Sequence, residues 1–226
     1  MKRTVLVFDL DDTLYAERQF VLSGFAAVDQ WLQEERGIAG FASEATRLFA
    51  AGRRGRIFDE ALDNLGVSPP TELVAKLVTI YRGHKPKLTL FAEARWAIER
   101  FHGEFKLGII TDGYAETQRN KVAALGVGGQ FDCIVYTDDL GRENWKPSPM
   151  AFRLLMNRFG AEGHECIYVG DNPVKDFLAP NELGWLTVMV SREGGEYRNA
   201  GDKISAPLYE AKKVIRSLRD LGDYIG

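Results

Sequence analysis

The sequence predicts an α/β protein, a Rossmann-like, doubly wound parallel sheet with an inserted all-α domain. Three observations lead to this fold class. Short apolar, β-branched runs recur without alternating polar residues, as strands buried on both faces do. Segments with apolar residues at helical spacing separate these runs, which is the order of βαβ units. The interval between residues 8 and 106 holds no strand-like run and is too long for one crossover.

Five apolar runs are predicted to be the strands of the sheet. One lies near the N-terminus, and the other four lie beyond residue 105. They are Thr4–Phe8, Lys106–Ile110, Cys133–Tyr136, Cys166–Val169 and Leu186–Val190. Because helical patterns lie between them, we expect these strands to run parallel in a single sheet.

Two helical patterns accompany the later strands. The first follows the third strand and comprises Phe152, Leu155, Met156 and Phe159. The second follows the last strand and comprises Leu208, Ala211, Ile215 and Leu218. Apolar residues at this spacing lie on one face of a helix, so we predict a helix at each place. The polar, glycine-rich stretch Ser191–Lys203 is expected to be a surface loop.

The long interval after the first strand predicts an inserted helical domain of residues 15–88. Its strongest amphipathic pattern comprises Val21, Phe25, Val28, Trp31 and Leu32. A second pattern comprises Val74, Leu77, Val78 and Tyr81. Weaker helical candidates are Glu44–Ala51 and Ile57–Leu65. The chain is therefore expected to divide into a core of residues 1–14 and 89–226 and this inserted domain.

The composition is that of a folded protein with a surface of mixed charge. The 226 residues are 45% hydrophobic and carry a formal net charge of −3. These values exclude a disordered chain and a disulfide scaffold, and they argue against nucleic acid as a partner. No segment has the apolar length that spans a bilayer, so no membrane partner is expected. Cys133 and Cys166 lie in apolar runs and suit a reducing compartment, so we expect a cytoplasmic protein.

Charged and hydroxyl side chains gather where the predicted strands end. In an open α/β sheet, ligands bind at the carboxyl ends of the strands, so these positions are the candidate site. The residues concerned are Asp9, Asp11 and Thr13 after the first strand, Thr111, Asp112 and Gly113 after the second, Lys146 after the third, and Asp171 and Asp176 after the fourth.

So many carboxylates at one edge of a sheet require a counter-charge. Two like charges 4 Å apart repel by about 4 kcal/mol at an effective dielectric constant near 20. Oxygen ligands with spare coordination for a phosphate are what Mg²⁺ prefers. The cluster, with Lys146 beside it, therefore predicts a Mg²⁺ site.

The order of these residues resembles the four motifs of the haloacid dehalogenase superfamily. The motifs are Asp9-x-Asp11-x-Thr13, Thr111, Lys146-Pro147 and Gly170-Asp171-x-x-x-x-Asp176. Each motif alone is short, but all four occur in order and each at a predicted strand end. The inserted helical region is similar to the C1 cap of subfamily I. The resemblance covers essentially the whole chain.

The resemblance implies an aspartyl-phosphate mechanism. Asp9 would attack phosphorus, and Asp11 would protonate the leaving group and then activate water. Mg²⁺ would be held by the Asp9 carboxylate, the Asp11 backbone carbonyl and Asp171. The retained second aspartate, Asp11, favours phosphoester hydrolysis over cleavage of a carbon–halogen bond.

The remaining motif residues are implied to bind phosphate or to support the site. Thr111 and the backbone N–H groups of Asp112 and Gly113 would bind a phosphoryl oxygen, and Lys146 would neutralise developing charge. Asp176 would orient Lys146 or a metal-bound water, and Thr13 would fix the loop after the first strand.

The expected function is that of a Mg²⁺-dependent phosphatase of a small phosphorylated metabolite, such as a sugar phosphate, a nucleotide or a phospho-acid. A sugar phosphomutase of the same fold and a catalytically silent binding protein are the alternatives. The protein is expected to be a monomer or a homodimer. Arg53, Arg54 and Arg56 form the densest cationic group, which predicts either a solvated connection between helices or a contact with an anionic substrate tail.

Overall fold

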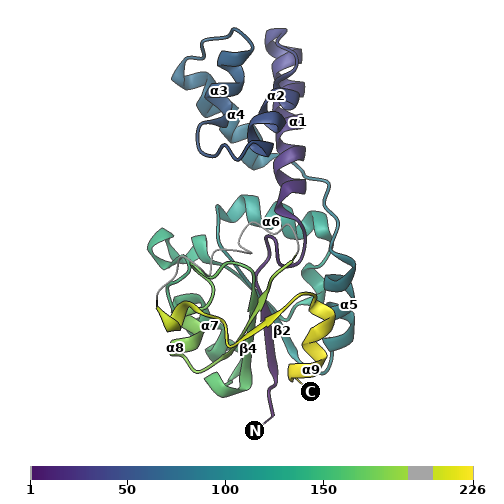
Figure 1. Cartoon of the computed structure of the whole chain (residues 1–226), viewed down its shortest axis with the longest axis vertical. Coiled ribbons are helices and arrows are strands. Elements are labelled where there is room, and N and C mark those ends of the chain that lie inside the picture. The colour runs from purple at the N-terminus through teal and green to yellow at the C-terminus, as the bar shows by residue number, and fades with distance from the viewer. Residues whose placement is uncertain (1, 193–205, 226) are drawn as a thin grey trace. The chain divides into compact units, whose positions relative to one another are not determined.

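The computed structural model describes residues 2–192 and 206–225, and the chain divides into two compact units (Figure 1). The core unit comprises Met1–Ala16 and Thr89–Gly226, and the helical unit comprises Glu17–Leu88. Most of the predicted surface loop, from residue 193 to residue 203, lies outside the described residues.

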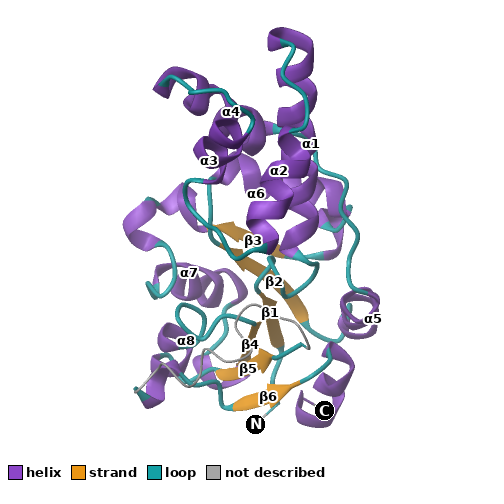
Figure 2. Cartoon of the chain, turned by 45° about the horizontal axis from the view of Figure 1, so that its top comes forward, coloured by secondary structure: helices purple, strands orange, loops and turns teal. Residues whose placement is uncertain are grey.

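The core unit is built on a parallel sheet, visible in Figure 2, with the order β3-β2-β1-β4-β5-β6. The strands are β1 (Val5–Phe8), β2 (Lys106–Thr111), β3 (Cys133–Tyr136), β4 (Cys166–Gly170), β5 (Leu186–Val190) and β6 (Lys213–Ile215). All five pairings are parallel. The predicted fold class and its five strands are confirmed. Because β1 lies between β2 and β4, the order reverses there, and the carboxyl end of β1 is the expected ligand site.

Helices cover both faces of the sheet. Figures 1 and 2 show α7 (Met150–Phe159) and α8 (Leu178–Glu182) on one face, and α5 (Ala92–Phe101) and α9 (Gly222–Ile225) on the other. Under α7 and α8 the rings of Phe152, Tyr168 and Trp185 pack edge to face. Burying such a side chain contributes roughly 1.5–3 kcal/mol, so this core holds the strand ends in place. The predicted helix after the third strand is therefore confirmed as α7.

The helix predicted from Leu208 to Leu218 is wrong. This segment instead contains short 3-10 turns at Pro207–Tyr209 and Leu218–Leu221, with β6 between them. Val214 and Ile215 are β-branched and pair in parallel with β5, and the sheet edge supplies backbone partners that a helix would otherwise have to provide. The apolar spacing was compatible with a helix, but tertiary pairing decided the outcome.

The helical unit contains four helices around its own apolar core. They are α1 (Glu17–Arg36), α2 (Phe41–Ala50), α3 (Ile57–Asn64) and α4 (Thr71–Gly83). Phe25 is central, because its ring lies 5.9–6.4 Å from those of Phe41, Phe49, Phe58 and Tyr81. The four predicted helical segments of this interval are therefore helices. Most of the face predicted for α1 is buried, whereas in α4 the buried residues are Leu73 and Leu77, of which only Leu77 belongs to the predicted face.

The two chain segments that lead to and from the helical unit pair with each other inside the core unit. Tyr15 and Leu90 form an isolated antiparallel bridge. The Phe91 backbone N–H donates to the Leu14 carbonyl at 2.9 Å. The two positions of the core unit between which the helical unit is inserted are thus paired with each other.

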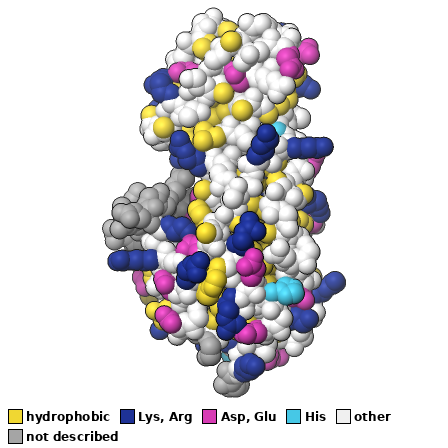
Figure 3. Space-filling model, turned by 90° about the vertical axis from the view of Figure 1, so that its right-hand side faces the viewer, with side chains coloured by type: hydrophobic (Ala, Val, Ile, Leu, Met, Phe, Trp, Pro, Cys, Tyr) yellow, Lys and Arg dark blue, Asp and Glu magenta, His cyan; other side chains and the backbone are white. Residues whose placement is uncertain are grey.

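The surface agrees with the mixed charge of the sequence. On the face shown in Figure 3, basic and acidic side chains are interspersed. Among the described residues, no helix has both the length and the apolar character needed to cross a membrane.

Candidate active site

The loop after β1 places two aspartates at the carboxyl edge of the sheet. The backbone N–H of Asp9 continues the β1–β4 pairing by donating to the Val169 carbonyl at 2.8 Å. The loop then turns sharply, with Asp12 in the left-handed region at φ 52°. Asp9 is only 1% exposed, so its carboxylate has almost no contact with bulk water.

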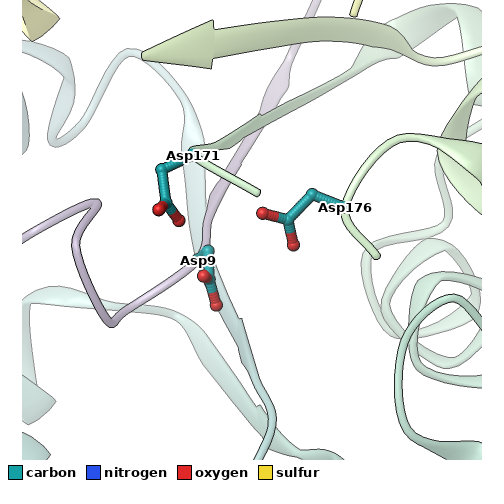
Figure 4. Close-up of side chains that lie close together, drawn as sticks. All are labelled: Asp9, Asp171 and Asp176. Carbon is teal, nitrogen blue, oxygen red and sulfur yellow. The ribbon is translucent and has the colours of Figure 1, made fainter. Parts of the chain in front are cut away.

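Three buried carboxylates meet at this point. One oxygen from each of Asp9, Asp171 and Asp176 lies within 4.8 Å of the others. Figure 4 shows the Asp171 and Asp176 carboxylates directed toward Asp9. The Thr13 hydroxyl donates to Asp171 Oδ1 at 3.4 Å. The structure therefore brings together four of the residues that the sequence assigned to the site.

Lys146 supplies positive charge to the carboxylate cluster. Its Nζ donates to Asp9 Oδ1 at 2.7 Å, to Asp176 Oδ1 at 2.7 Å and to the Tyr168 hydroxyl at 2.9 Å. The side chain is fully buried, and these three bonds use all three of its N–H donors. Lys146 is therefore held in place by Asp9, Asp176 and Tyr168 together.

The charge balance of the cluster is uneven. Burial, which the charges of Lys146 and Lys175 offset only in part, raises the pKa of Asp9 to about 6. Burial and the neighbouring Asp176 and Asp9 raise the pKa of Asp171 well above its ordinary value. Burial also acts on Asp176, but Lys146 and Lys175 outweigh it and hold the pKa of that carboxyl below its ordinary value. Ionisation of all three carboxylates is thus disfavoured without further positive charge.

The donor set fits a hard divalent cation. Asp9 Oδ2 is buried and accepts no hydrogen bond from any residue that the structure describes. Three carboxylates face two ammonium groups, those of Lys146 and Lys175, which leaves one excess negative charge. Buried carboxylate oxygens that together carry excess negative charge match the oxygen ligands that Mg²⁺ prefers. The predicted metal ligands Asp9 and Asp171 lie in this group.

Asp11 has a separate environment. Its carboxylate accepts hydrogen bonds from Gln118 Nε2 at 2.9 Å, from Lys121 Nζ at 2.7 and 2.9 Å, and from the Tyr15 hydroxyl. Burial alone would raise the pKa of Asp11, but the charge of Lys121 and these hydrogen bonds together lower it. The side chain is therefore held as a carboxylate, outside the three-carboxylate group.

The segment after β2 is tied to its surroundings. Thr111 Oγ1 accepts a hydrogen bond from Gln118 Nε2 at 2.5 Å. Asp112 Oδ1 accepts from the Thr137 hydroxyl at 2.7 Å and from the Lys146 backbone N–H at 3.1 Å, which links this loop to Lys146. Gly113 has φ 123°, a backbone conformation that residues with a side chain rarely adopt. The predicted phosphate-binding segment is thus a defined turn in the same part of the core unit.

Sequence reasoning missed the residues that surround the motifs. Gln118 and Lys121 lie on the buried side of α6 (Ala115–Leu125), three residues apart, where apolar side chains are usual. This polar pair on a buried helix face was the available signal. The sequence offered no indication of a role for Tyr168, because a tyrosine in an apolar strand is expected to pack in the core.

Arg192 was missed as well. It follows β5, donates through Nη2 to the Thr13 carbonyl at 2.8 Å and through Nη1 to the Asp12 carbonyl at 2.5 Å, and pairs with Glu93 through Nε at 2.7 Å. It thereby holds the backbone of the loop that carries the aspartates. Nothing in its local sequence indicated these contacts.

The arginines of the helical unit have local partners. Arg53 forms two hydrogen bonds with Glu60, at 2.9 and 2.8 Å, and Arg56 lies 3.5 Å from Asp59. Arg54 donates to the carbonyls of Phe49 and Arg53 and lies over the Phe49 ring at 4.2 Å. These contacts favour the solvated connection between helices over recognition of an anionic tail.

Comparison with known proteins assigns this chain to a family. A sequence profile described as haloacid dehalogenase-like hydrolase matches residues 6–190. The match spans every strand-end residue from Asp9 to Asp176.

Individual relatives align with nearly the whole chain. The chain is 28% identical to a glyceraldehyde 3-phosphate phosphatase of Methanopyrus kandleri, over 96% of this chain and 97% of that protein. It is 30% identical to pyrophosphatase PpaX of Halalkalibacterium halodurans, over 100% and 98% of the two chains. The magnesium-bound crystal structure of YfnB from Bacillus subtilis shares the fold, with a TM-score of 0.69, 20% identity and complete coverage of both chains (100%).

Proposed function

The chain belongs to the haloacid dehalogenase-like hydrolases, and from this premise we propose that it is a Mg²⁺-dependent phosphatase acting through Asp9 on a small phosphorylated metabolite. Its family and its relatives make it a phosphoric monoester hydrolase. The observation that carries the finer proposal is the state of Asp9. One oxygen accepts a hydrogen bond from Lys146, and the other is buried without a hydrogen-bond donor among the described residues.

An unpartnered carboxylate oxygen suits nucleophilic attack. In the first step, an Asp9 oxygen forms a bond to phosphorus and the bond from phosphorus to the ester oxygen breaks. In the second step, water attacks the same phosphorus and releases inorganic phosphate and the free carboxylate. Lys146 stabilises negative charge on Asp9 and on the phosphoryl group, and its three fixed hydrogen bonds mean that it need not reorganise.

Asp9 and Asp171 through their carboxylates, and Asp11 through its backbone carbonyl, would hold Mg²⁺. When bound, the cation offsets the repulsion between the carboxylate nucleophile and the phosphate dianion. The unbalanced charge of the cluster supports this assignment.

Asp11 would act as general acid and then as general base. It donates a proton to the leaving oxygen in the first step and takes one from water in the second. Its bonds to Lys121 and Gln118 favour the carboxylate form, which is the form that activates water. For the first step Asp11 must take up a proton before the leaving group departs.

Thr111, Asp112 and Gly113 would bind the phosphoryl oxygens, and Thr13 and Asp176 would hold Asp171 and Lys146 in place. The hydrogen bonds from Thr13 to Asp171 and from Lys146 to Asp176 support the last two roles. The domain assignment, a core of residues 1–14 and 89–226 with a cap of residues 15–88, belongs to this proposal. Cytoplasmic location and a monomeric or homodimeric state stay predictions.

The test is release of inorganic phosphate from a panel of phosphate compounds. It includes p-nitrophenyl phosphate and the compounds on which relatives are named to act, glyceraldehyde 3-phosphate, phosphoserine and pyrophosphate. We expect Mg²⁺-dependent release that excess chelator abolishes. Undiminished release in chelator would contradict the metal, and conversion of a hexose phosphate to its isomer without phosphate release would indicate a mutase.

A further inference from the structure

A second lysine faces the nucleophile candidate and has no role in the chemistry described above. Lys175 lies in the loop between β4 and α8, directly before Asp176. Its Nζ is 4.0 Å from Asp9 Oδ2, the carboxylate oxygen that accepts no hydrogen bond within residues 2–192 and 206–225. The Lys175 side chain is 28% exposed, whereas that of Asp9 is 2% exposed. Lys175 therefore lies between the buried cluster and solvent.

The two lysines of the site differ in what their ammonium groups do. Lys146 uses all three N–H donors on Asp9, Asp176 and Tyr168. The ammonium of Lys175 donates no hydrogen bond to any residue that the structure describes, and its distance to Asp9 Oδ2 exceeds that of a hydrogen bond. An anion that enters the site can thus gain three donors from Lys175 without breaking a bond, but none from Lys146.

We propose that Lys175 is a further catalytic residue, whose ammonium group contacts an oxygen of the phosphoryl group while that group is transferred to and from Asp9. The inference rests on the proposed phosphatase function. A carboxylate oxygen in position to attack lies about 3–3.5 Å from phosphorus. The oxygens bonded to that phosphorus then lie at similar distances from the attacking Asp9 oxygen. An ammonium 4.0 Å from Asp9 Oδ2 is within hydrogen-bond reach of an oxygen placed there.

The charges support a phosphate contact over simple neutralisation of the carboxylates. Three carboxylates opposite Lys146 and a bound divalent cation already balance, with three negative and three positive charges. Lys175 adds a further positive charge to this group, which favours an incoming phosphate dianion. A charge-assisted hydrogen bond to such a dianion is among the strongest polar contacts in proteins.

The experiment measures binding of inorganic phosphate and of Mg²⁺ by calorimetry. It uses the full chain and the variants Lys175→Met, Lys175→Gln and Lys175→Arg. The matched control is Lys106→Met, which removes one positive charge at the start of β2, at the opposite edge of the sheet, where Lys106 pairs with exposed Asp132 at 3.3 Å.

We expect the two neutral variants to bind phosphate roughly 10- to 100-fold more weakly in saturating Mg²⁺, as loss of a charge-assisted hydrogen bond implies. Their affinity for Mg²⁺ alone should be unchanged or higher, because a neighbouring positive charge has gone. Lys175→Arg should retain most of the phosphate affinity, and Lys106→Met should retain all of it.

Unchanged phosphate affinity in the folded neutral variants would overturn the inference. Loss of Mg²⁺ affinity, or failure of both neutral variants to fold by circular dichroism, would also overturn it, because Lys175 would then be a structural counter-ion. Failure of the proposed function itself is distinguishable, since the unmodified protein would then neither hydrolyse phosphate esters nor bind phosphate.

Discussion

The surface of the helical unit and the buried carboxylate cluster of the core unit differ in how their charges are balanced. In the helical unit, Arg53 and Arg47 are exposed and each pairs with one glutamate of its own unit, Glu60 and Glu44. In the core unit, Asp9, Asp171 and Asp176 are buried and share too few positive charges. Exposed pairs of this kind contribute little to stability, whereas buried unbalanced charge costs free energy. A protein retains such a cost where the charge is used, so the comparison separates the site from the surface.

The largest test of this comparison is Asp9→Asn. The amide retains the size of the carboxylate but cannot attack phosphorus, so turnover should fall by at least about a thousandfold. Phosphate release from p-nitrophenyl phosphate measures the loss, and Lys106→Met serves as the control with near-native rate. A variant that keeps a tenth of the original rate would mean that another group is the nucleophile.

The same substitution should stabilise the metal-free protein. Burial raises the pKa of Asp9 to about 6, so the folded state binds a proton more readily than the unfolded state does. The ionised carboxylate thus costs free energy above pH 6, by about 3 kcal/mol, and this cost disappears as the pH falls to about 4. Asp9→Asn should therefore be the more stable protein at pH 7 in chelator, with a difference that closes on acidification.

Urea unfolding at several pH values measures this difference. Asp11→Asn provides a control of opposite sign. Lys121 and its hydrogen bonds lower the pKa of Asp11, so that carboxylate stabilises the fold at neutral pH and loses its contribution as the pH falls through its lowered folded-state pKa. If both substitutions changed the free energy of unfolding equally and independently of pH, the two carboxylates would not differ in pKa as described.

A smaller effect is expected at Lys121, which holds the Asp11 carboxylate at 2.7 and 2.9 Å. Lys121→Met should lower kcat at least tenfold for an alkyl phosphate and for p-nitrophenyl phosphate alike, because both share the second step, in which the Asp11 carboxylate takes a proton from water. Lys121→Arg, which keeps a positive charge beside Asp11, should restore part of the rate. A lowered unfolding midpoint with no rescue by Lys121→Arg would assign Lys121 to the fold and not to the placement of Asp11.

The smallest effects are expected in the helical unit. Arg53→Ala removes an exposed pair with Glu60, and Arg54→Ala removes a cation–π contact with Phe49. Each should change kcat/KM less than about twofold for every substrate of the panel. A selective rise of KM for a substrate with a second anionic group would instead restore the anionic-tail hypothesis for these arginines.

The sequence predicted most of what depends on local pattern and strand order. Buried β-branched runs identified five strands, and the rule that ligands bind at strand ends led to Asp9, Lys146 and Asp171. β6 was missed because only Ile215 of its three residues is buried, so it shows no apolar run. The roles assigned to the site residues stay predictions.

Contacts that depend on tertiary packing could not be predicted. Lys121 reaches Asp11 across 110 positions of sequence, and Arg192 reaches Thr13 across 179. The distance from Lys175 to Asp9 also depends on the path of the loop between β4 and α8, which no sequence pattern specifies. Long polar side chains of this kind carry no periodicity, so only the folded backbone decides what they contact.

The bridge between Tyr15 and Leu90 has a consequence for how this enzyme can be altered. Because the chain leaves and re-enters the core unit at paired positions, we expect residues 17–88 to be replaceable by another insert or a short linker without a change in the strand order of the sheet. Such a replacement would show which properties of the enzyme depend on the core unit alone.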